Sequence, residues 1–270
     1  MPGQIPVNEI SLRINNLQGQ IARKGWDACL ILSNVNLYYY TGTVQRAYLY
    51  VPQEGEPVLF VQRNYERAQK EAAIKHILKI GKPEEIEMLL QELGLSRPGK
   101  IGMELETLPV KEYGRWLKVF KKVEVLDATS LIRKQRAIKS PYEIGLLKEN
   151  GKKAKEVFSI FPDIIESNHT DYELGARVEY EFRKRGHLGL IRSHGLGQDF
   201  FFGQVLVGEN GVVPSPYDIA LGGQGLALSF PQGTSGTIIK DHQPILIDYV
   251  VNFNGYNVDI TRSYSRGKLP

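Results

Sequence analysis

The feature that most constrains the fold of this chain is a pair of apolar segments near residue 250. Residues 245–253 and 256–262 are rich in β-branched and aromatic residues, and Asn254-Gly255 joins them. Asn-Gly between two such runs is a strong hairpin signal, because both residues tolerate the positive φ that a type I′ turn requires. The sequence therefore predicts an antiparallel β-hairpin centred on these two residues.

Two aspartates lie on this hairpin. A two-residue loop at 254–255 would place Asp259 opposite Val250 and one diagonal step from Asp248, whereas a loop at 253–254 would place the two aspartates directly opposite each other. Because side chains alternate between faces, both registers put the carboxylates on one face, roughly 5–8 Å apart. Carboxylates this close favour a cation or a proton between them. The pair therefore predicts a metal site, and the alternative is a surface hairpin with two solvated acids.

The residues around the two aspartates resemble a known superfamily. Thr261 and Arg262 follow the second aspartate and offer a hydroxyl and a cation as partners for the metal ligands. The spacing of the aspartates, the Gly-Tyr before Asp259 and the Thr-Arg after it resemble the first two metal ligands of the creatinase/methionine-aminopeptidase ("pita-bread") superfamily. That superfamily includes Xaa-Pro aminopeptidase and prolidase. The resemblance identifies Asp248 and Asp259 as metal ligands, with Thr261 and Arg262 supporting them. The alternative for Arg262 is a simple counter-charge to the two aspartates of the hairpin.

The upstream chain fits the same resemblance. Strands alternate with helices over residues 1–128, which predicts an α/β domain with a mixed sheet that resembles the creatinase-type N-terminal domain. Helices are predicted over 7–24, 65–73, 84–93 and 110–120, and strands over 27–32, 47–51, 57–61, 101–103 and 123–126. Tyr38–Gly42 resembles the end of a further strand in that domain. Residues 129–139 are interpreted as a linker.

Residues 140–270 resemble the first half of an α+β pita-bread metallopeptidase domain. Capping boxes that begin at Ser140 and Thr170 predict the starts of two helices, and the hairpin follows a Gly-rich region. The resemblance implies a second half that carries one His and two Glu as further ligands. Because the sequence ends at Pro270, we expect a truncated form of a longer enzyme, with little or no activity as given.

No catalytic or substrate-binding residue is identified. The resemblance implies a catalytic His upstream of the first aspartate, but Ser215 is at the position expected to be His, and counting back from Asp248 reaches Pro231 instead. A serine without a partner is not a general base near neutral pH. His194 precedes the aspartates, whereas the family's ligand follows them, so it is interpreted as a loop residue. His242 is predicted to be exposed.

The resemblance implies a metal-dependent Xaa-Pro aminopeptidase or dipeptidase that cleaves short proline-containing peptides and forms a homodimer. Two divalent ions, Mn, Co or Zn, are expected in the full-length enzyme. Carboxylates are hard ligands that do not choose among these three metals. The alternative is that this chain alone holds no metal ion. Two other functions stay open. One is a metal-free, creatinase-like hydrolase of a C–N bond, and the other is a non-catalytic relative that binds peptide or protein.

Composition limits the remaining possibilities. The net charge is +4 without a dense Lys/Arg run, which gives nucleic-acid binding no support. Cys29, the single cysteine, lies in an apolar run and is interpreted as a small buried residue. A chain with one cysteine forms no internal disulfide, which agrees with a cytoplasmic location. No apolar run is long enough for a membrane span, so no membrane partner is expected.

Overall fold

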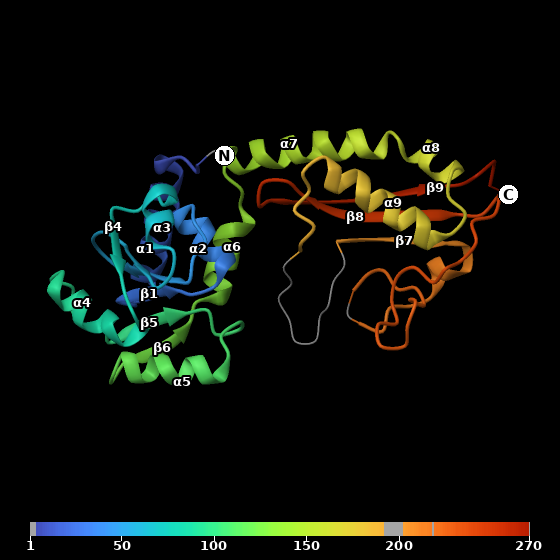
Figure 1. The fold of residues 1–270 in the computed structure, drawn as a ribbon. Helices are drawn as coiled ribbons and strands as arrows, with labels where there is room; N and C mark the ends of the chain where they lie inside the picture. Colours follow the sequence, from blue (N-terminus) through green and yellow to red (C-terminus); the bar gives the residue numbers. More distant parts are fainter. Residues whose placement is uncertain (1–3, 192–201, 218, 270) are drawn as a thin grey trace. The chain divides into compact units, whose positions relative to one another are not determined.

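The chain divides into two compact units, Met1–Lys139 and Ser140–Pro270, in a computed structural model that describes residues 4–191, 202–217 and 219–269 (Figure 1). His194, interpreted above as a loop residue, lies outside the described residues. The second unit begins at Ser140, where the sequence predicts a helix start. Among the described residues, no helix combines the length and the apolar character needed to cross a bilayer.

The first unit is built on a six-stranded mixed sheet with the order β4-β3-β2-β1-β5-β6. The strands are β1 (Ala28–Ile31), β2 (Ala47–Pro52), β3 (Val58–Val61), β4 (His76–Lys79), β5 (Lys100–Met103) and β6 (Glu124–Asp127). The helices are α1 (Val7–Arg23), α2 (Asn34–Thr41), α3 (Tyr65–Glu71), α4 (Ile86–Glu92), α5 (Val110–Val119) and α6 (Thr129–Ala137), with a 3-10 turn at Pro83–Glu85. β2 pairs antiparallel with β1 and β3, and the other neighbours pair parallel, so the mixed sheet is as predicted.

Two predictions for the first unit were wrong. Residues 129–139 do not form a free linker, because α6 packs into this unit and buries Leu131 and Ile132. Its Gln135 also accepts a hydrogen bond from the Tyr40 hydroxyl at 3.1 Å. The segment 38–42, expected as a strand end, is the last turn of α2, which ends at Gly42 with a φ of 80°. Cys29 is fully buried as predicted, and burial raises the pKa of its thiol.

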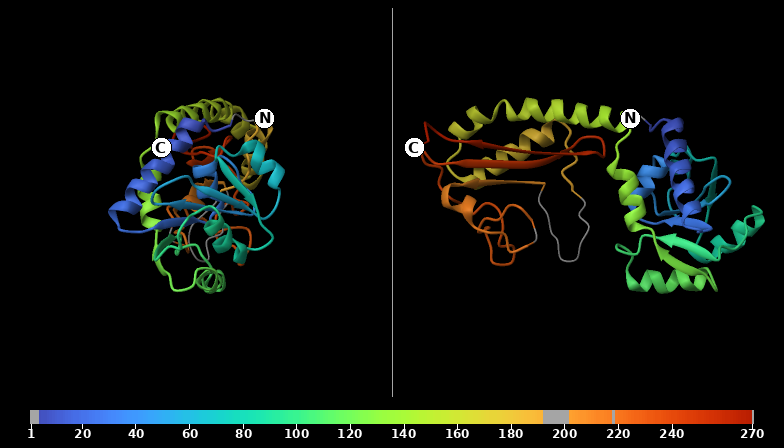
Figure 2. Two further views of the ribbon diagram at one scale, coloured as in Figure 1. Left: turned by 90° about the vertical axis from the view of Figure 1, so that its left-hand side faces the viewer. Right: turned by 180° about the vertical axis from the view of Figure 1, so that it is seen from behind.

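The second unit places three helices on one face of a three-stranded antiparallel sheet with the order β7-β8-β9 (Figures 1 and 2). The helices are α7 (Pro141–Phe158), α8 (Phe161–Glu166) and α9 (Asp171–Lys184), and the strands are β7 (Gly203–Val207), β8 (Ile245–Asn252) and β9 (Asn257–Tyr264). Both predicted capping boxes form. The Ser140 hydroxyl accepts from the Glu143 amide at 3.2 Å, and the Thr170 hydroxyl accepts from the Glu173 amide at 3.2 Å.

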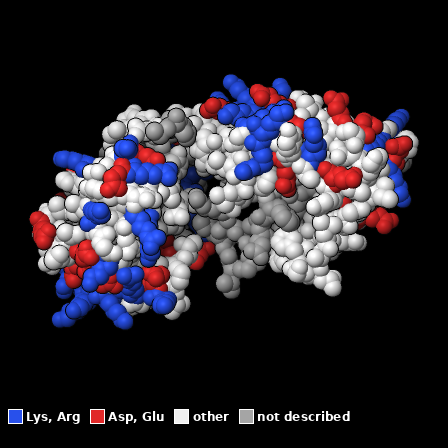
Figure 3. All heavy atoms as spheres, viewed as in Figure 1, with Lys and Arg blue, Asp and Glu red and all other residues white. Residues whose placement is uncertain are grey.

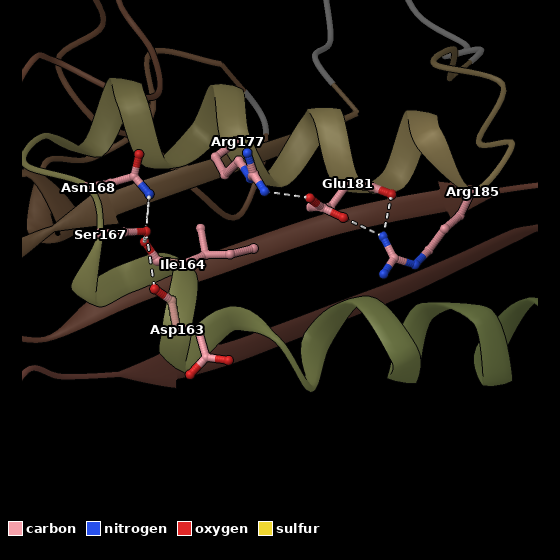
Figure 4. Close-up of polar contacts among 7 residues, drawn as sticks. All are labelled: Asp163, Ile164, Ser167, Asn168, Arg177, Glu181 and Arg185. Atoms are coloured by element: carbon pink, nitrogen blue, oxygen red, sulfur yellow. Dashed lines mark hydrogen bonds and ion pairs between the residues drawn. The ribbon is translucent and has the colours of Figure 1, made fainter.

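Polar contacts fix the corner between α8 and α9 (Figure 4). The Asn168 amide donates to the Ile164 carbonyl at 2.5 Å, which satisfies an acceptor at the end of α8. On α9, the buried Glu181 forms ion pairs with Arg177 at 2.9 Å and Arg185 at 2.5 Å. The hydrogen bond from Arg185 lowers the pKa of Glu181. Its partners lie four residues before and after it, on α9 and at the end of that helix, so these contacts are structural.

The helices and the sheet share one apolar core. Alternate residues of β8, from Ile245 to Val251, face α7, α8 and α9 and are almost completely buried. Gly203 on β7 pairs with Tyr249 on β8, and a Cβ at Gly203 would overlap the Tyr249 ring. A glycine is therefore required where this ring crosses the neighbouring strand.

Replacing Gly203 with alanine should lower the free energy of unfolding of the second unit by about 1–3 kcal/mol, because the ring must move out of a packed core. Gly145→Ala is the control: its Cβ would have nothing within 4 Å, and it lies inside α7, so it should raise stability by about 0.5–1 kcal/mol. Urea denaturation followed by far-UV circular dichroism measures both. A Gly203→Ala protein as stable as the wild type would show that the ring does not constrain this position.

Candidate metal centre

The β8–β9 hairpin has the first of the two predicted registers. Asp259 pairs with Val250, and Thr261 pairs with Asp248, so the aspartates lie one diagonal step apart. The turn differs from the prediction. Pairing ends at Asn252 and Asn257, which leaves a four-residue loop, and within it only Gly255 has a positive φ, 92°.

Side-chain amides explain why a type I′ turn is not used. Asn252 Oδ1 accepts from the Gly255 amide at 2.7 Å, and Asn254 Oδ1 accepts from the Tyr256 amide at 3.3 Å. From α7, the Asn150 amide donates to Asn254 Oδ1 at 2.9 Å and to the Tyr256 carbonyl at 2.6 Å. These bonds stabilise a wider loop that keeps the register of the two-residue turn.

The face of the sheet opposite the helices carries both aspartates, and we call it the acid face. It consists of Gln204 and Leu206 on β7, Leu246, Asp248, Val250 and Asn252 on β8, and Asn257, Asp259, Thr261 and Ser263 on β9. Asp248 on the central strand is partly buried, and Asp259 on the edge strand is exposed. Strand alternation therefore brings the two predicted ligands together, with one shielded from water and the other open to it.

The electrostatics of Asp248 fit a cation site. Burial raises the pKa of its carboxyl, and the charge of Asp259 raises it further. The Thr261 hydroxyl donates a hydrogen bond to Asp248 Oδ1, and this bond lowers the pKa of the carboxyl. An ionised Asp248 is thus disfavoured unless a positive charge approaches it. Two oxygen-donor carboxylates on one face are suitable ligands for a divalent ion.

The two residues expected to support the ligands lie on different faces. Thr261 contacts Asp248 directly, as described above. Arg262 pairs with Ile247, so its side chain lies on the helix face, where its guanidinium is 6.0 Å from the centre of the Phe158 ring. It also donates to the Thr261 carbonyl at 2.7 Å. Arg262 therefore does not face the carboxylates that it was expected to support.

The long connection between β7 and β8 covers the β7 side of the acid face. A Cβ at Gly223 would come within 2.8 Å of the Leu206 side chain, which places this connection against the acid face. Buried polar groups hold it there. The Asp171 carboxylate accepts from the backbone amide of Ser235 at 3.0 Å, and the side-chain amide of Asn210 donates to the Gly233 carbonyl at 3.0 Å. Figure 3 shows an uncharged surface in this region, and the segment 211–239 contains one charged residue, Asp218.

The positions where a catalytic His was sought do not provide a base. Ser215 lies in this connection, and its hydroxyl accepts a hydrogen bond from the Tyr217 amide two residues later at 3.0 Å. Pro231, the other candidate position, has no titratable group. His242 is exposed as predicted, with Nδ1 2.6 Å from the Lys268 carbonyl. Among the described residues, no group of three or more His, Cys, Asp or Glu side chains is placed to hold a metal ion.

Sequence reasoning missed a buried histidine beside the sheet. His187 follows α9 and is 3% exposed. Its Nδ1 accepts from the Gly189 amide at 2.7 Å, so Nε2 carries the proton and donates to the Val250 carbonyl at 3.1 Å. Burial lowers the pKa of this imidazole and keeps it neutral. Its hydrogen bonds are all to backbone, and no motif in the sequence marks it.

Comparison with known proteins gives two family matches that divide the chain. Residues 13–138 match the Creatinase/Prolidase N-terminal domain, and residues 145–270 match metallopeptidase family M24. Among curated proteins, an uncharacterized peptidase, YqhT, of Bacillus subtilis is 24% identical over 261 residues, which cover 95% of this chain and 65% of YqhT. The Xaa-Pro dipeptidase of Pyrococcus horikoshii is 28% identical over 244 residues, which cover 88% of this chain and 59% of that enzyme.

Solved structures agree on the fold. An Xaa-Pro dipeptidase from Bacillus anthracis superimposes with a TM-score of 0.78 at 21% identity, over 97% of this chain and 66% of that one. The prolidase from Pyrococcus horikoshii gives a TM-score of 0.74 at 22% identity, over 96% and 66% of the two chains. These matches confirm the predicted fold class, a creatinase-type α/β domain followed by part of a pita-bread domain. The chain spans less than two thirds of the length of its curated relatives.

Variants of the two neighbours of Asp248 should move its pKa in opposite directions. Asp259→Asn should lower the pKa of Asp248 without returning it to the ordinary value, because burial, the larger cause, remains. Thr261→Val should raise it further, because the hydrogen bond that stabilises the ionised form is lost. Titration of the ¹³C-labelled carboxyl by NMR in metal-free protein measures both shifts. Equal pKa values of Asp248 in the two variants would contradict the opposite effects assigned to Asp259 and Thr261.

The raised pKa of Asp248 should also make the stability of the protein depend on pH. A carboxyl whose pKa rises on folding favours the folded state while protonated, and this contribution is lost as the pH rises through the folded-state pKa. Metal-free Asp248→Asn protein should therefore be more stable than the wild type at pH 7, and the difference should shrink toward about pH 4, near the ordinary carboxyl pKa. Urea denaturation at the two pH values tests this, and a difference that grows on acidification would contradict it.

Proposed function

Because the chain belongs to the creatinase/methionine-aminopeptidase superfamily, with an M24 metallopeptidase match after its creatinase-type domain, we propose that the protein is a metal-dependent Xaa-Pro peptidase. The observation that carries this proposal is the acid face. Asp248 and Asp259 lie together on it, and burial and mutual repulsion raise the pKa of Asp248. A purely structural surface acid would gain nothing from the partly buried position of Asp248.

Asp248 and Asp259 are the proposed ligands of two divalent ions, Mn, Co or Zn. When bound, such ions polarise a scissile carbonyl and activate water at neutral pH. Thr261 holds Asp248 Oδ1 and so fixes the orientation of the carboxylate. Val250 and Leu246 flank Asp248 along β8 and restrict its contact with water. Low water access strengthens the interaction between the carboxylate and a cation.

The proposed substrates are short peptides with proline after the scissile bond. This follows from relatives that are described as an Xaa-Pro dipeptidase and prolidases. We propose in addition that the protein acts in the cytoplasm as a homodimer. The creatinase-type domain would limit substrates to short peptides, as the resemblance implies.

One observation favours a second function. Ser215 replaces the expected His, and its hydroxyl is engaged in its own turn. A protein without that imidazole keeps the metal site and the fold but lacks one group for proton transfer. A relative that binds proline-containing peptides without cleaving them is therefore the alternative to the peptidase.

The decisive experiment uses protein expressed from its natural reading frame, loaded with Mn²⁺ and assayed on Xaa-Pro dipeptides. Asp259→Asn should lower bound metal and reduce kcat/KM by at least about 100-fold, because the ion loses a charged ligand. Asp241→Asn, which removes an exposed acid just before β8, is the control and should behave like the wild type. Metal analysis reads out occupancy directly.

Three other results are informative. Stoichiometric metal with dipeptide binding but no cleavage would favour the binding protein. Cleavage of creatine without metal would favour the creatinase-like hydrolase. Activity that is unchanged in Asp259→Asn would contradict the assignment of the acid face as the metal centre.

A further inference from the structure

Gln204 occupies a position on the acid face that no motif in the sequence marks. On β7 it pairs directly with Asp248 of β8, and Asp248 pairs on its other side with Thr261 of β9. The three residues form one row across the sheet, and side chains in such a row have Cβ atoms about 4.5–5.5 Å apart. Gln204 therefore neighbours Asp248 on the side away from Thr261, on the same face of the sheet.

The Gln204 side chain has an unsatisfied acceptor. Its Oε1 is buried from solvent and has no hydrogen-bond partner among the described residues. A buried polar atom without a partner is unfavourable by about 1–3 kcal/mol, and such atoms are rare in native proteins. Neither Thr261 nor an ionised Asp248 can repair this. Asp248 offers acceptors when ionised, and the Thr261 proton is already donated to Asp248.

The surrounding connection restricts where this carboxamide can go. Gln204 Cδ would lie 3.9 Å from a Cβ placed on Gly233, so the backbone there packs against the side chain. That backbone is itself fixed, because the Gly233 carbonyl accepts from the buried Asn210 amide at 3.0 Å. The Gln204 carboxamide thus packs against the Gly233 backbone, and its oxygen is covered from water.

Asn150 and Gln232 also carry buried amide oxygens without partners among the described residues. Neither belongs to the sheet row that contains Asp248. Asn150 lies on α7, on the helix side, and Gln232 lies in the connection between β7 and β8. Placement therefore singles out Gln204.

We propose that Gln204 Oε1 is a third protein oxygen ligand for a divalent ion held by Asp248 and Asp259. This inference rests on the proposed function and names an additional ligand of that site. Three acceptors on one face of the sheet would be satisfied together by a cation. Because carbonyl and carboxylate oxygens suit Mn²⁺ better than the softer ions, the added amide shifts the preference of the site toward manganese.

The test is Mn²⁺ titration of metal-free protein from the natural reading frame, followed by electron paramagnetic resonance and calorimetry. Gln204→Leu, which keeps the bulk and removes the oxygen, should raise the Kd for Mn²⁺ about tenfold. Gln204→Glu, which supplies a charged oxygen, should lower the Kd. Gln232→Leu is the matched control, because it removes a buried carboxamide outside the row, and it should leave the Kd unchanged.

The possible failures are distinguishable. Mn²⁺ binding that is lost in Asp248→Asn but within twofold of the wild type in Gln204→Leu would overturn the role of Gln204 and leave the proposed function intact. Equal weakening in Gln204→Leu and Gln232→Leu would also overturn it, since packing alone would explain the loss. No saturable binding to the wild type would overturn the proposed function together with this inference. Gln204→Glu supplies a gain that a misfolded variant cannot produce.

Discussion

The candidate site depends on the pairing of β8 with β9, and hydrophobic burial fixes that pairing. The odd-numbered residues of β8 from 245 to 251 and the partly buried Val258 and Ile260 of β9 all face the helices. A slip of one residue would turn Asp259 into this apolar core, which makes such a register prohibitive. A slip of two would keep the faces but place the aspartates opposite each other. The amide-stabilised loop at 253–256 selects between these two, so core and loop together determine the carboxylate geometry.

The helix caps and the period-two pattern are local signals, and they allowed much of the fold to be predicted. The capping boxes at Ser140 and Thr170 and the diagonal placement of the aspartates follow from neighbouring residues, and the alternation of strands and helices along the chain indicated the mixed sheet. The failures involve distant partners. The segment 38–42 of α2 was expected as a strand end from its resemblance to the creatinase-type domain, but Glu104 from beyond β5 accepts the Ser33 amide at 2.9 Å where the helix begins. The charged segment of α6 resembled a linker because its contacts with Tyr40 and α1 are tertiary.

The residues of the candidate site likewise divide into those that local sequence predicts and those that depend on distant contacts. Asp248, Asp259 and Thr261 were accessible to sequence reasoning because one hairpin carries them. Gln204 was not, since 43 residues separate it from its neighbour Asp248 on the adjacent strand, with residues 208–244 between β7 and β8. Arg262 was assigned by its proximity in sequence, yet adjacent residues of a strand point to opposite faces. The same alternation that brought the aspartates together therefore removed the cation expected beside them.

The position of Arg262 bears on what neutralises the acid face. None of the ten acid-face positions on β7, β8 and β9 is Lys or Arg, and the segment 211–239 that adjoins this face contains neither residue. A structural acid pair in a folded protein is ordinarily accompanied by a cationic side chain, because a partly buried unpaired carboxylate is unfavourable. Here the strands and the covering connection supply hydroxyl and amide groups instead. Such neutral groups orient carboxylates without competing for their charge, which leaves that charge available to a bound metal ion.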